Sequence, residues 1–204
     1  MVYLMKGIYA ILDEGNFNFK KLDIYIHKMI DMKIKFFQIR IKSSITKEKI
    51  NAIWKIKKLC LEKNCILLIN DNIELAKNLD LDGIHIGAND IDIIDARRIL
   101  GEKKIIGVSC YNNVKLALQA EERNATYVSF GSLYKTKTKE KPVELEIKTV
   151  KEAKNVIKIP ICVIGGINKD NIHKVIKLNC DLIAISNGLS SIDKINKISK
   201  IYYG

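Results

Sequence analysis

A strand-like run and a basic loop are joined in the stretch Tyr127-Val-Ser-Phe-Gly-Ser-Leu-Tyr-Lys-Thr-Lys-Thr-Lys139. Its first part, up to Phe130, alternates aromatic, branched and small residues, which favours a β-strand, and Gly131 frees the backbone where the strand ends. Its second part is a basic loop rich in hydroxyl groups, which is suited to surrounding phosphate oxygens. A lone basic run is more often an ordinary solvated loop, so its position in the fold must decide between the two interpretations.

The same pattern, an apolar run followed by a polar segment, occurs eight times along the chain. Apolar runs predict strands at 7–12, 35–40, 65–70, 83–86, 104–109, 126–130, 161–165 and 182–186. Amphipathic segments predict helices near 20–32, 46–63, 72–79, 92–100, 113–123, 144–157, 168–178 and 190–200. Strict alternation indicates parallel strands with crossover helices. We therefore predict a single α/β domain over 1–204, a closed (β/α)8 TIM barrel of nearly minimal size.

A doubly wound open sheet is the alternative to the barrel. Such a sheet commonly carries a glycine-rich dinucleotide turn after its first strand. Asp13-Glu14-Gly15-Asn16 stands at that place instead, which favours the barrel.

Composition limits the function classes. The formal charge of +12 at pH 7 comes from lysines spread over nearly every predicted helix, and no aromatic and basic residues interleave as in single-strand binders, so we expect no nucleic-acid partner. No run approaches the roughly 20 apolar residues of a membrane span, and no secretory signal is visible, which predicts a cytoplasmic protein without a membrane partner. Five cysteines without a C-x-x-C pair predict buried thiols rather than disulfides or zinc.

In a barrel, polar residues at the carboxyl ends of the strands converge on one mouth. The second predicted strand ends in Gln38, Arg40 and Lys42, which point the same way if the strand persists. Two cations and an amide would then face this mouth together. The alternative is a strand edge with ordinary solvated basic groups.

Two aspartates follow neighbouring strands. Asp71 comes after the third strand and Asp90 after the fourth, so they could share a Mg2+ ion, which needs only one or two carboxylates besides water and substrate phosphates. Each could instead be the N-cap of the following helix. His85 lies within the fourth strand with no second histidine nearby, which favours a packed residue over a metal ligand or base.

Small polar residues end the later strands. Ser109 offers a hydroxyl group after the fifth strand, and Gly165-Gly166 and Ile185-Ser186 end the seventh and eighth. Barrels commonly hold a phosphate at the last two loops, through backbone amides.

Together these residues resemble the thiamine phosphate synthase (thiamine phosphate pyrophosphorylase) family, with the thiazole tautomerase as its close relative. The resemblance spans nearly the whole chain, and the order and spacing of its motifs carry it. The motifs are Tyr9-Ala10-Ile11-x-Asp13, Gln38-x-Arg40-x-Lys42, Asn70-Asp71, Asp82-Gly-Ile-His-Ile-Gly87-x-x-Asp90, Gly107-Val-Ser109, Phe130-Gly131 with Thr136-x-Thr138-Lys139, Ile164-Gly-Gly-Ile167 and Ile185-Ser186.

The resemblance implies a Mg2+-dependent transferase of thiamine biosynthesis. It would join 4-amino-5-hydroxymethyl-2-methylpyrimidine diphosphate to 4-methyl-5-(2-phosphoethyl)thiazole, giving thiamine phosphate and pyrophosphate. Gln38 would meet the aminopyrimidine, and Ser109 would lie beside the reacting group. The diphosphate would be gripped by Arg40, Lys42, Asn70 and Lys139, and Mg2+ would be bound by Asp71 and Asp90. The thiazole phosphate would be held by Thr136, Thr138, Gly165, Gly166, Ile185 and Ser186. Arg40, Lys42, Ser109 and Lys139 would be the catalytic residues.

Several positions depart from the family pattern, namely Ala88, Tyr111 and Lys135 in place of the usual glutamine, histidine and proline, and the segment after Lys139 is short. In the tautomerase a histidine follows the glycine that ends strand six, whereas Ser132 stands here, which disfavours a tautomerase. A catalytically silent phosphate-binding barrel stays an alternative. We expect small-molecule substrates as partners, and a homodimer stays open.

Overall fold

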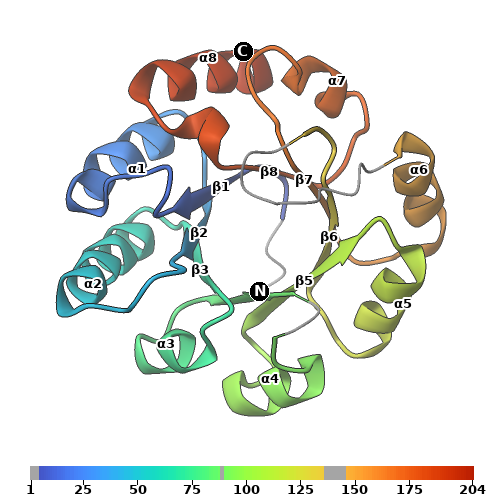
Figure 1. The fold of residues 1–204 in the computed structure, drawn as a ribbon, viewed down its shortest axis with the longest axis horizontal. Coiled ribbons are helices and arrows are strands. Elements are labelled where there is room, and N and C mark those ends of the chain that lie inside the picture. Colours follow the sequence, from blue (N-terminus) through green and yellow to red (C-terminus); the bar gives the residue numbers. More distant parts are fainter. Residues whose placement is uncertain (1–4, 88–89, 136–145) are drawn as a thin grey trace.

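A computed structural model describes residues 5–87, 90–135 and 146–204. Eight parallel strands close into a barrel in which each strand pairs with its neighbours in the sequence, and β1 closes on β8. The helices form a ring around the strands (Figure 1). The predicted (β/α)8 barrel is thereby confirmed.

The strands are β1 (Gly7–Asp13), β2 (Phe36–Arg40), β3 (Ile66–Asn70), β4 (Gly83–Ile86), β5 (Ile105–Tyr111), β6 (Tyr127–Gly131), β7 (Ile161–Ile164) and β8 (Leu182–Ile185). The α-helices are α1 (Leu22–Asp31), α2 (Lys47–Glu62), α3 (Ile73–Asn78), α4 (Ile93–Leu100), α5 (Val114–Glu122), α6 (Ile147–Val156), α7 (Ile172–Ile176) and α8 (Ile192–Tyr203). Two short 3-10 helices, η1 (Phe19–Lys21) and η2 (Asn187–Leu189), precede α1 and α8.

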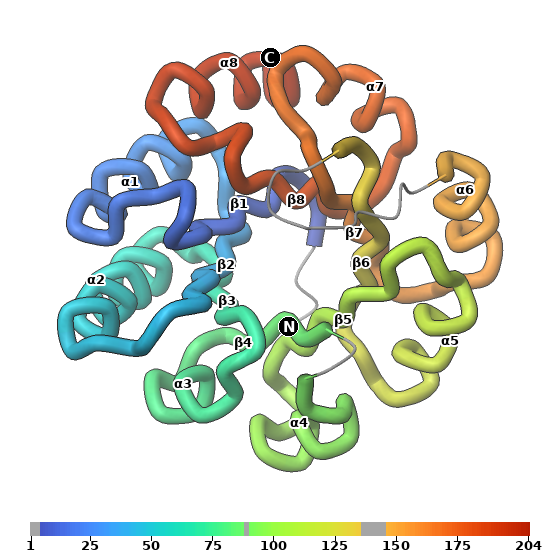
Figure 2. Tube along the Cα trace, in the orientation of Figure 1, coloured from blue at the N-terminus to red at the C-terminus, as the bar shows by residue number. Residues whose placement is uncertain are grey.

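Side chains alternate between two apolar cores because successive residues of a strand point to opposite faces. A large outer core lies between the strands and the helices. Figure 2 traces the backbone of these two layers. A smaller core fills the barrel itself, and Tyr9, Phe36 and Tyr127 are its largest side chains. Tyr9 meets both of the other rings edge to face. These aromatic rings fill the interior of the barrel. The polar residues at the carboxyl ends of the strands lie beyond them and form the mouth.

The seventh helix differs from its predicted form. Helix α7 has only five residues, whereas the amphipathic pattern predicts 168–178. Nδ2 of Asn171 donates to the carbonyl of Gly166 at 3.0 Å, and its Oδ1 accepts from the amide of Asn168 at 2.8 Å. These local bonds replace the first helical turn, as asparagine commonly does near turns. They also hold the glycine turn at the rim of the barrel.

Strand β5 extends two residues past its predicted end at Ser109. Its pairing with β6 shifts register between Ser109 and Tyr111, so that Tyr111 lies opposite Phe130. Such a bulge bends a strand and re-aims its side chains, and Tyr111 takes a positive φ of 54°.

All five cysteines are buried and free, as the sequence predicts. Within the described part of the chain, no helix combines the length and apolarity needed to cross a membrane.

Candidate active site

The carboxyl end of β2 carries two cations, and each pairs with a carboxylate of a neighbouring strand. Arg40 forms an ion pair with Asp13, which lies beside it in the register of β1 and β2. Lys42 lies two residues past the strand, and its Nζ is 2.5 Å from Oδ2 of Asp71. Arg40 and Lys42, two of the predicted diphosphate ligands, are therefore held at the mouth by Asp13 on one side and Asp71 on the other.

Glu14 organises the backbone that carries Lys42. Its carboxylate accepts from the amides of Lys42 and Ser43, at 2.5 and 2.6 Å, and from Nζ of Lys49 at 2.8 Å. Partial burial acts to raise the pKa of Glu14, but the ion pair with Lys49 and the hydrogen bonds from the loop outweigh it and lower that pKa to about 2. Glu14 is thus ionised throughout the neutral range and anchors the loop after β2.

Asp71 and Asp90 come together at the ends of β3 and β4. Removal from water raises the pKa of Asp90, and a hydrogen bond with the side chain of Asp71 raises it further. Oδ2 of Asp90 also accepts from the amide of Gly87 at 2.6 Å. Two carboxyl groups that share a site in this way resist being ionised together unless a cation joins them.

Neither aspartate caps a helix. The N-cap of α3 is Asn72, whose Oδ1 accepts from the amide of Leu75 at 2.8 Å. The N-cap of α4 is Asp92, whose Oδ1 accepts from the amide of Ile94 at 2.8 Å. The capping alternative is therefore wrong for both residues. Asp71 instead pairs with Lys42, and Asp90 accepts from the amide of Gly87.

A chain of hydrogen bonds crosses the barrel below the mouth. Nε2 of Gln38 donates to the hydroxyl of Tyr9, which lies 3.0 Å from the hydroxyl of Tyr127. Nδ1 of His85 is 2.8 Å from the Tyr127 hydroxyl, and its Nε2 is 2.9 Å from Oγ of Ser109. Burial holds the pKa of both tyrosines above its usual range. The interpretation of His85 as only a packed residue missed this chain.

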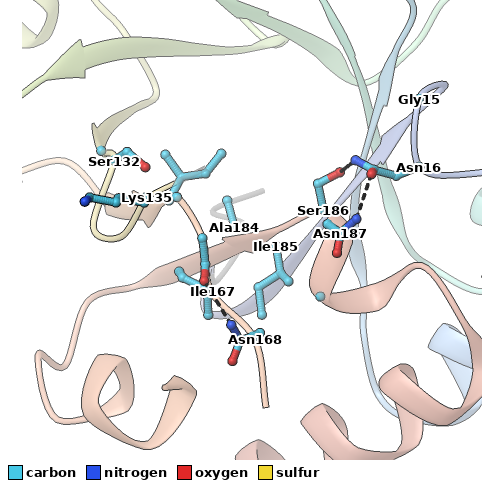
Figure 3. A pocket seen from close by; sticks show the side chains of 15 residues that line it. Gly15, Asn16, Ser132, Lys135, Ile167, Asn168, Ala184, Ile185, Ser186 and Asn187 are labelled. Atoms are coloured by element: carbon cyan, nitrogen blue, oxygen red, sulfur yellow. Dashed lines mark hydrogen bonds between the residues drawn. The ribbon is translucent and has the colours of Figure 1, made fainter. Parts of the chain in front are cut away.

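A cavity of about 570 Å3 opens beside the ends of β6, β7 and β8 (Figure 3). Its lining includes all four residues predicted at these last two strand ends, which are Gly165, Gly166, Ile185 and Ser186. Lys135, from the loop after β6, lines the same cavity. A basic side chain and a glycine turn thus share a space large enough for a small ligand.

Asn16 closes this cavity from the side of β1, and sequence reasoning missed it. Its Nδ2 donates to Oγ of Ser186 at 3.0 Å, and its Oδ1 accepts from Nδ2 of Asn187 at 2.9 Å (Figure 3). No local signal marks this contact, because the asparagine stands 170 residues before Ser186. Closure of the barrel alone brings them together.

Gly165 is required by a close approach. Its φ is 115°, and a Cβ there would lie 2.0 Å from Oγ of Ser132. The Ser132 hydroxyl donates to the carbonyl of Tyr134 at 2.6 Å, and the amide of Tyr134 donates to the carbonyl of Gly165 at 3.1 Å. The loop after β6 is therefore fastened to the glycine turn after β7.

Comparison with known proteins decides the family. Residues 8–189 match the family model described as thiamine monophosphate synthase. This chain belongs to that family. It is 34% identical to the thiamine-phosphate synthase of Nitrosomonas eutropha, over 96% of this chain and 92% of the relative. It is 37% identical to the enzyme of that name from Clostridium acetobutylicum, over 90% and 88%.

One solved structure agrees with this family, and a second one shares the fold. Thiamine phosphate pyrophosphorylase from Pyrococcus furiosus superposes with a TM-score of 0.83 at 27% identity, covering 97% of this chain and 95% of that chain. Geranylgeranylglyceryl phosphate synthase from Thermoplasma acidophilum has a TM-score of 0.70 at 15% identity, a likeness that shows the fold alone.

The family residues that were predicted from the sequence and are described by the structure lie on one rim. Gln38 and Arg40 lie in the last part of β2, Asn70 ends β3, Ser109 lies two residues before the end of β5, and Ile185 ends β8. The segments that follow the strands hold Lys42, Asp71, Asp90, Gly165, Gly166 and Ser186. Thr136, Thr138 and Lys139 lie outside the described residues. The contacts of Asp13, Glu14 and Asn16 are additions to the predicted site, and all three belong to the end of β1 or the loop after it.

Proposed function

We propose that this protein is a thiamine phosphate synthase, joining the pyrimidine diphosphate to the thiazole phosphate with release of pyrophosphate. One observation carries the proposal within the family: a single mouth offers two separate places for phosphate. The first lies at the ends of β1 to β4, where Arg40 and Lys42 stand beside three carboxylates, Asp13, Asp71 and Asp90. The second is the cavity at β6 to β8. A reaction between two phosphorylated substrates needs both.

The pyrimidine diphosphate is assigned to the first place. Arg40 and Lys42 stand where they can exchange their carboxylate partners for diphosphate oxygens. Asn70 ends β3 directly before Asp71, and Lys139 completes the assignment by family resemblance. Gln38 and Ser109 lie at the two ends of the hydrogen-bonded chain below, where the ring would sit.

Mg2+ is assigned to Asp71 and Asp90. The raised pKa of Asp90 beside Asp71 fits a pair of carboxylates that a divalent cation would hold ionised. Mg2+ usually takes only one or two carboxylates and fills its octahedron with water and substrate phosphates, so this sparse pair suffices. When bound, the ion neutralises charge that develops on the leaving diphosphate.

The thiazole phosphate is assigned to the cavity. The Gly165-Gly166 turn and the backbone at Ile185-Ser186 supply amides, and Thr136 and Thr138 add hydroxyl groups by family resemblance. Asn16 keeps Ser186 in place. This arrangement would present the neutral thiazole nitrogen to the reacting carbon.

The reaction then needs positioning rather than a strong base. The C–O bond between the pyrimidine methylene and the diphosphate breaks, and both electrons leave with the diphosphate. The electron-rich aminopyrimidine stabilises the cation, and the thiazole nitrogen lone pair forms the new C–N bond. Arg40 and Lys42 neutralise the leaving group, and the rest of the rim aligns the two rings.

The tautomerase alternative is disfavoured by the environment of Ser132. Its hydroxyl donates its hydrogen to the carbonyl of Tyr134, so it is occupied in shaping the loop. A silent phosphate-binding barrel stays the second candidate. Location in the cytoplasm and pairing of two copies stay predictions, and light scattering on the purified protein checks the second.

The proposal is tested by an assay of pyrophosphate release with both substrates and Mg2+, with thiamine phosphate identified by mass. Omission of either substrate, or addition of a chelator, should stop release. Asp71→Ala and Asp90→Ala should each nearly abolish turnover, whereas Asp95→Ala, which removes a half-exposed carboxylate on α4, should leave it unchanged. Saturable binding of both ligands without product would favour the silent barrel. Isomerisation of the carboxylated thiazole phosphate alone, without ring joining, would establish the tautomerase.

A further inference from the structure

The hydrogen-bonded chain inside the barrel has a direction. A glutamine Nε2 can only donate, so the Tyr9 hydroxyl accepts from Gln38. The hydrogen of Tyr9 then has the Tyr127 oxygen as its acceptor, at 3.0 Å. If Tyr127 donated to Tyr9 instead, the hydrogen of Tyr9 would be buried without an acceptor, which is costly. Donation therefore runs from Gln38 through Tyr9 to Tyr127.

The same direction of hydrogen-bond donation continues through His85. The Tyr127 hydroxyl has already accepted from Tyr9, so its own hydrogen goes to Nδ1 of His85 at 2.8 Å. A neutral imidazole with an accepting Nδ1 carries its hydrogen on Nε2, and that hydrogen points at Oγ of Ser109, 2.9 Å away. The hydroxyl hydrogen of Ser109 is then left to point elsewhere. The orientation of the Ser109 hydroxyl group is thus determined by four side chains, those of Gln38, Tyr9, Tyr127 and His85.

The fold holds the middle of this chain rigidly. Tyr9 and Tyr127 are almost fully buried, at 1% and 0% exposure, so water does not compete for their hydroxyls. The His85 ring stacks on Tyr127 with an interplanar angle of 26°. Gly107 leaves room for Tyr127, because a Cβ there would lie 2.0 Å from its Cζ. The two ends, Gln38 and Ser109, are the residues that the proposed function places against the pyrimidine.

We propose that Tyr9 and Tyr127 are positioning residues that fix the donor and acceptor pattern of the pyrimidine site through His85. With its Nε2 committed to Tyr9, Gln38 presents its carbonyl oxygen as an acceptor, and Ser109 presents its hydroxyl hydrogen as a donor. An aminopyrimidine offers the complement, an exocyclic N–H and a ring nitrogen lone pair. A 4-oxo pyrimidine has no amino hydrogen to donate. The link to the pyrimidine rests on the proposed function, whereas the direction of the chain does not.

The first test reads the His85 hydrogen directly. Nitrogen-15 NMR at pH 8 distinguishes the two tautomers of a neutral imidazole, and His85→Gln assigns the signal among the three histidines of the chain. We expect the Nε2–H form in the wild type and a mixture of forms in Tyr127→Phe. An Nδ1–H form in the wild type would overturn the inference without any variant.

The second test measures discrimination by calorimetry. The ligands are the 4-amino-5-hydroxymethyl-2-methylpyrimidine monophosphate and its 4-oxo analogue, which need not react. The ratio of their dissociation constants should fall by about tenfold in Tyr127→Phe and in Tyr9→Phe, as one mismatched hydrogen bond would cause. A ratio unchanged in both variants would contradict the role assigned to the tyrosines.

Tyr203→Phe is the matched control. Its hydroxyl accepts from the amide of Ile8 near the start of β1, away from the mouth, and its removal should leave tautomer and ratio unchanged. Pyrophosphate release by the wild type tests the synthase activity separately from the hydrogen-bonded chain. Its absence, together with the expected tautomer and ratio, would refute the synthase activity while supporting the hydrogen-bonded chain.

Discussion

Asp90, in the loop after β4, has its pKa raised by removal from water and by a hydrogen bond with Asp71, which follows β3. The two residues cap no helix, since Asn72 and Asp92 do so. Helix capping therefore does not explain their proximity. This proximity costs stability wherever both groups must be ionised, and a divalent cation would offset that cost.

Asp90→Asn should stabilise the protein in the absence of Mg2+ and abolish its response to the ion. A carboxyl group whose folded pKa is raised contributes stability that is present below its unfolded pKa, about 3.9, and is lost as the pH rises through the folded value. The difference in melting temperature in favour of the variant should thus grow from pH 4 to neutrality. Adding Mg2+ at pH 7.5 should raise the melting temperature of the wild type only. Equal increases in both proteins would disprove the metal assignment.

Arg40→Ala should weaken binding of the pyrimidine diphosphate by about 1.5–3 kcal/mol, the range for a lost charge-assisted contact. The thiazole phosphate should bind almost unchanged, because its cavity lies at β6 to β8. Calorimetry with each ligand measures the two effects, and Lys139→Ala should behave in the same way. Arg98→Ala, which removes an exposed arginine paired with Asp95, is the control. Equal weakening of both ligands by Arg40→Ala would mean that the two phosphate places have been confused.

Gly165→Ala should cost more stability than Gly101→Ala, although both glycines have a positive φ. Gly101, at 84°, has nothing within 4 Å of an added Cβ, so only backbone strain of about 1–3 kcal/mol is expected. At Gly165 the added Cβ would also meet Ser132 at 2.0 Å, and such overpacking adds about 1–3 kcal/mol. Urea unfolding compares the two free energies. We further expect thiazole phosphate binding to be lost only in Gly165→Ala, and equal stability losses would argue against the close approach.

Ser132→Ala should reduce pyrophosphate release by less than about tenfold, below the 10²–10⁴-fold effect of removing a general acid or base. The hydroxyl donates to the carbonyl of Tyr134, a bond that shapes the loop and transfers no proton. Steady-state kinetics with both substrates check this expectation. A loss of a thousandfold or more, in a variant with normal circular dichroism, would assign Ser132 a chemical role.

Glu14→Gln should destabilise the protein at pH 7 and have a smaller effect at pH 3. A carboxylate whose folded pKa is lowered contributes stability that is present above its unfolded pKa, and loses it as the pH falls from about 4.5 toward 2. Thermal unfolding at both pH values measures this difference. Since Glu14 holds the backbone amide of Lys42, the variant should also bind the pyrimidine diphosphate more weakly. A stability difference independent of pH would rule out the ionised anchor.

The linear sequence was enough to predict the barrel and most residues of its rim. Eight apolar runs separated by amphipathic segments permit few arrangements, because parallel strands need crossover helices and the helices must cover both apolar faces. The same topology sends every strand end to one side. Asp71 and Asp90 could therefore be paired from their place after neighbouring strands, and the structure brings them together.

Contacts across the barrel depended on the tertiary structure. Tyr9 and Tyr127 are 118 residues apart, and Asn16 and Ser186 are 170 apart, so no local pattern couples either pair. Helix ends were also undecided, since an aspartate and a neighbouring asparagine are both good N-caps and only the backbone shows which one is used. The strands and their order follow from local periodicity, whereas register and barrel closure decide which side chains meet inside.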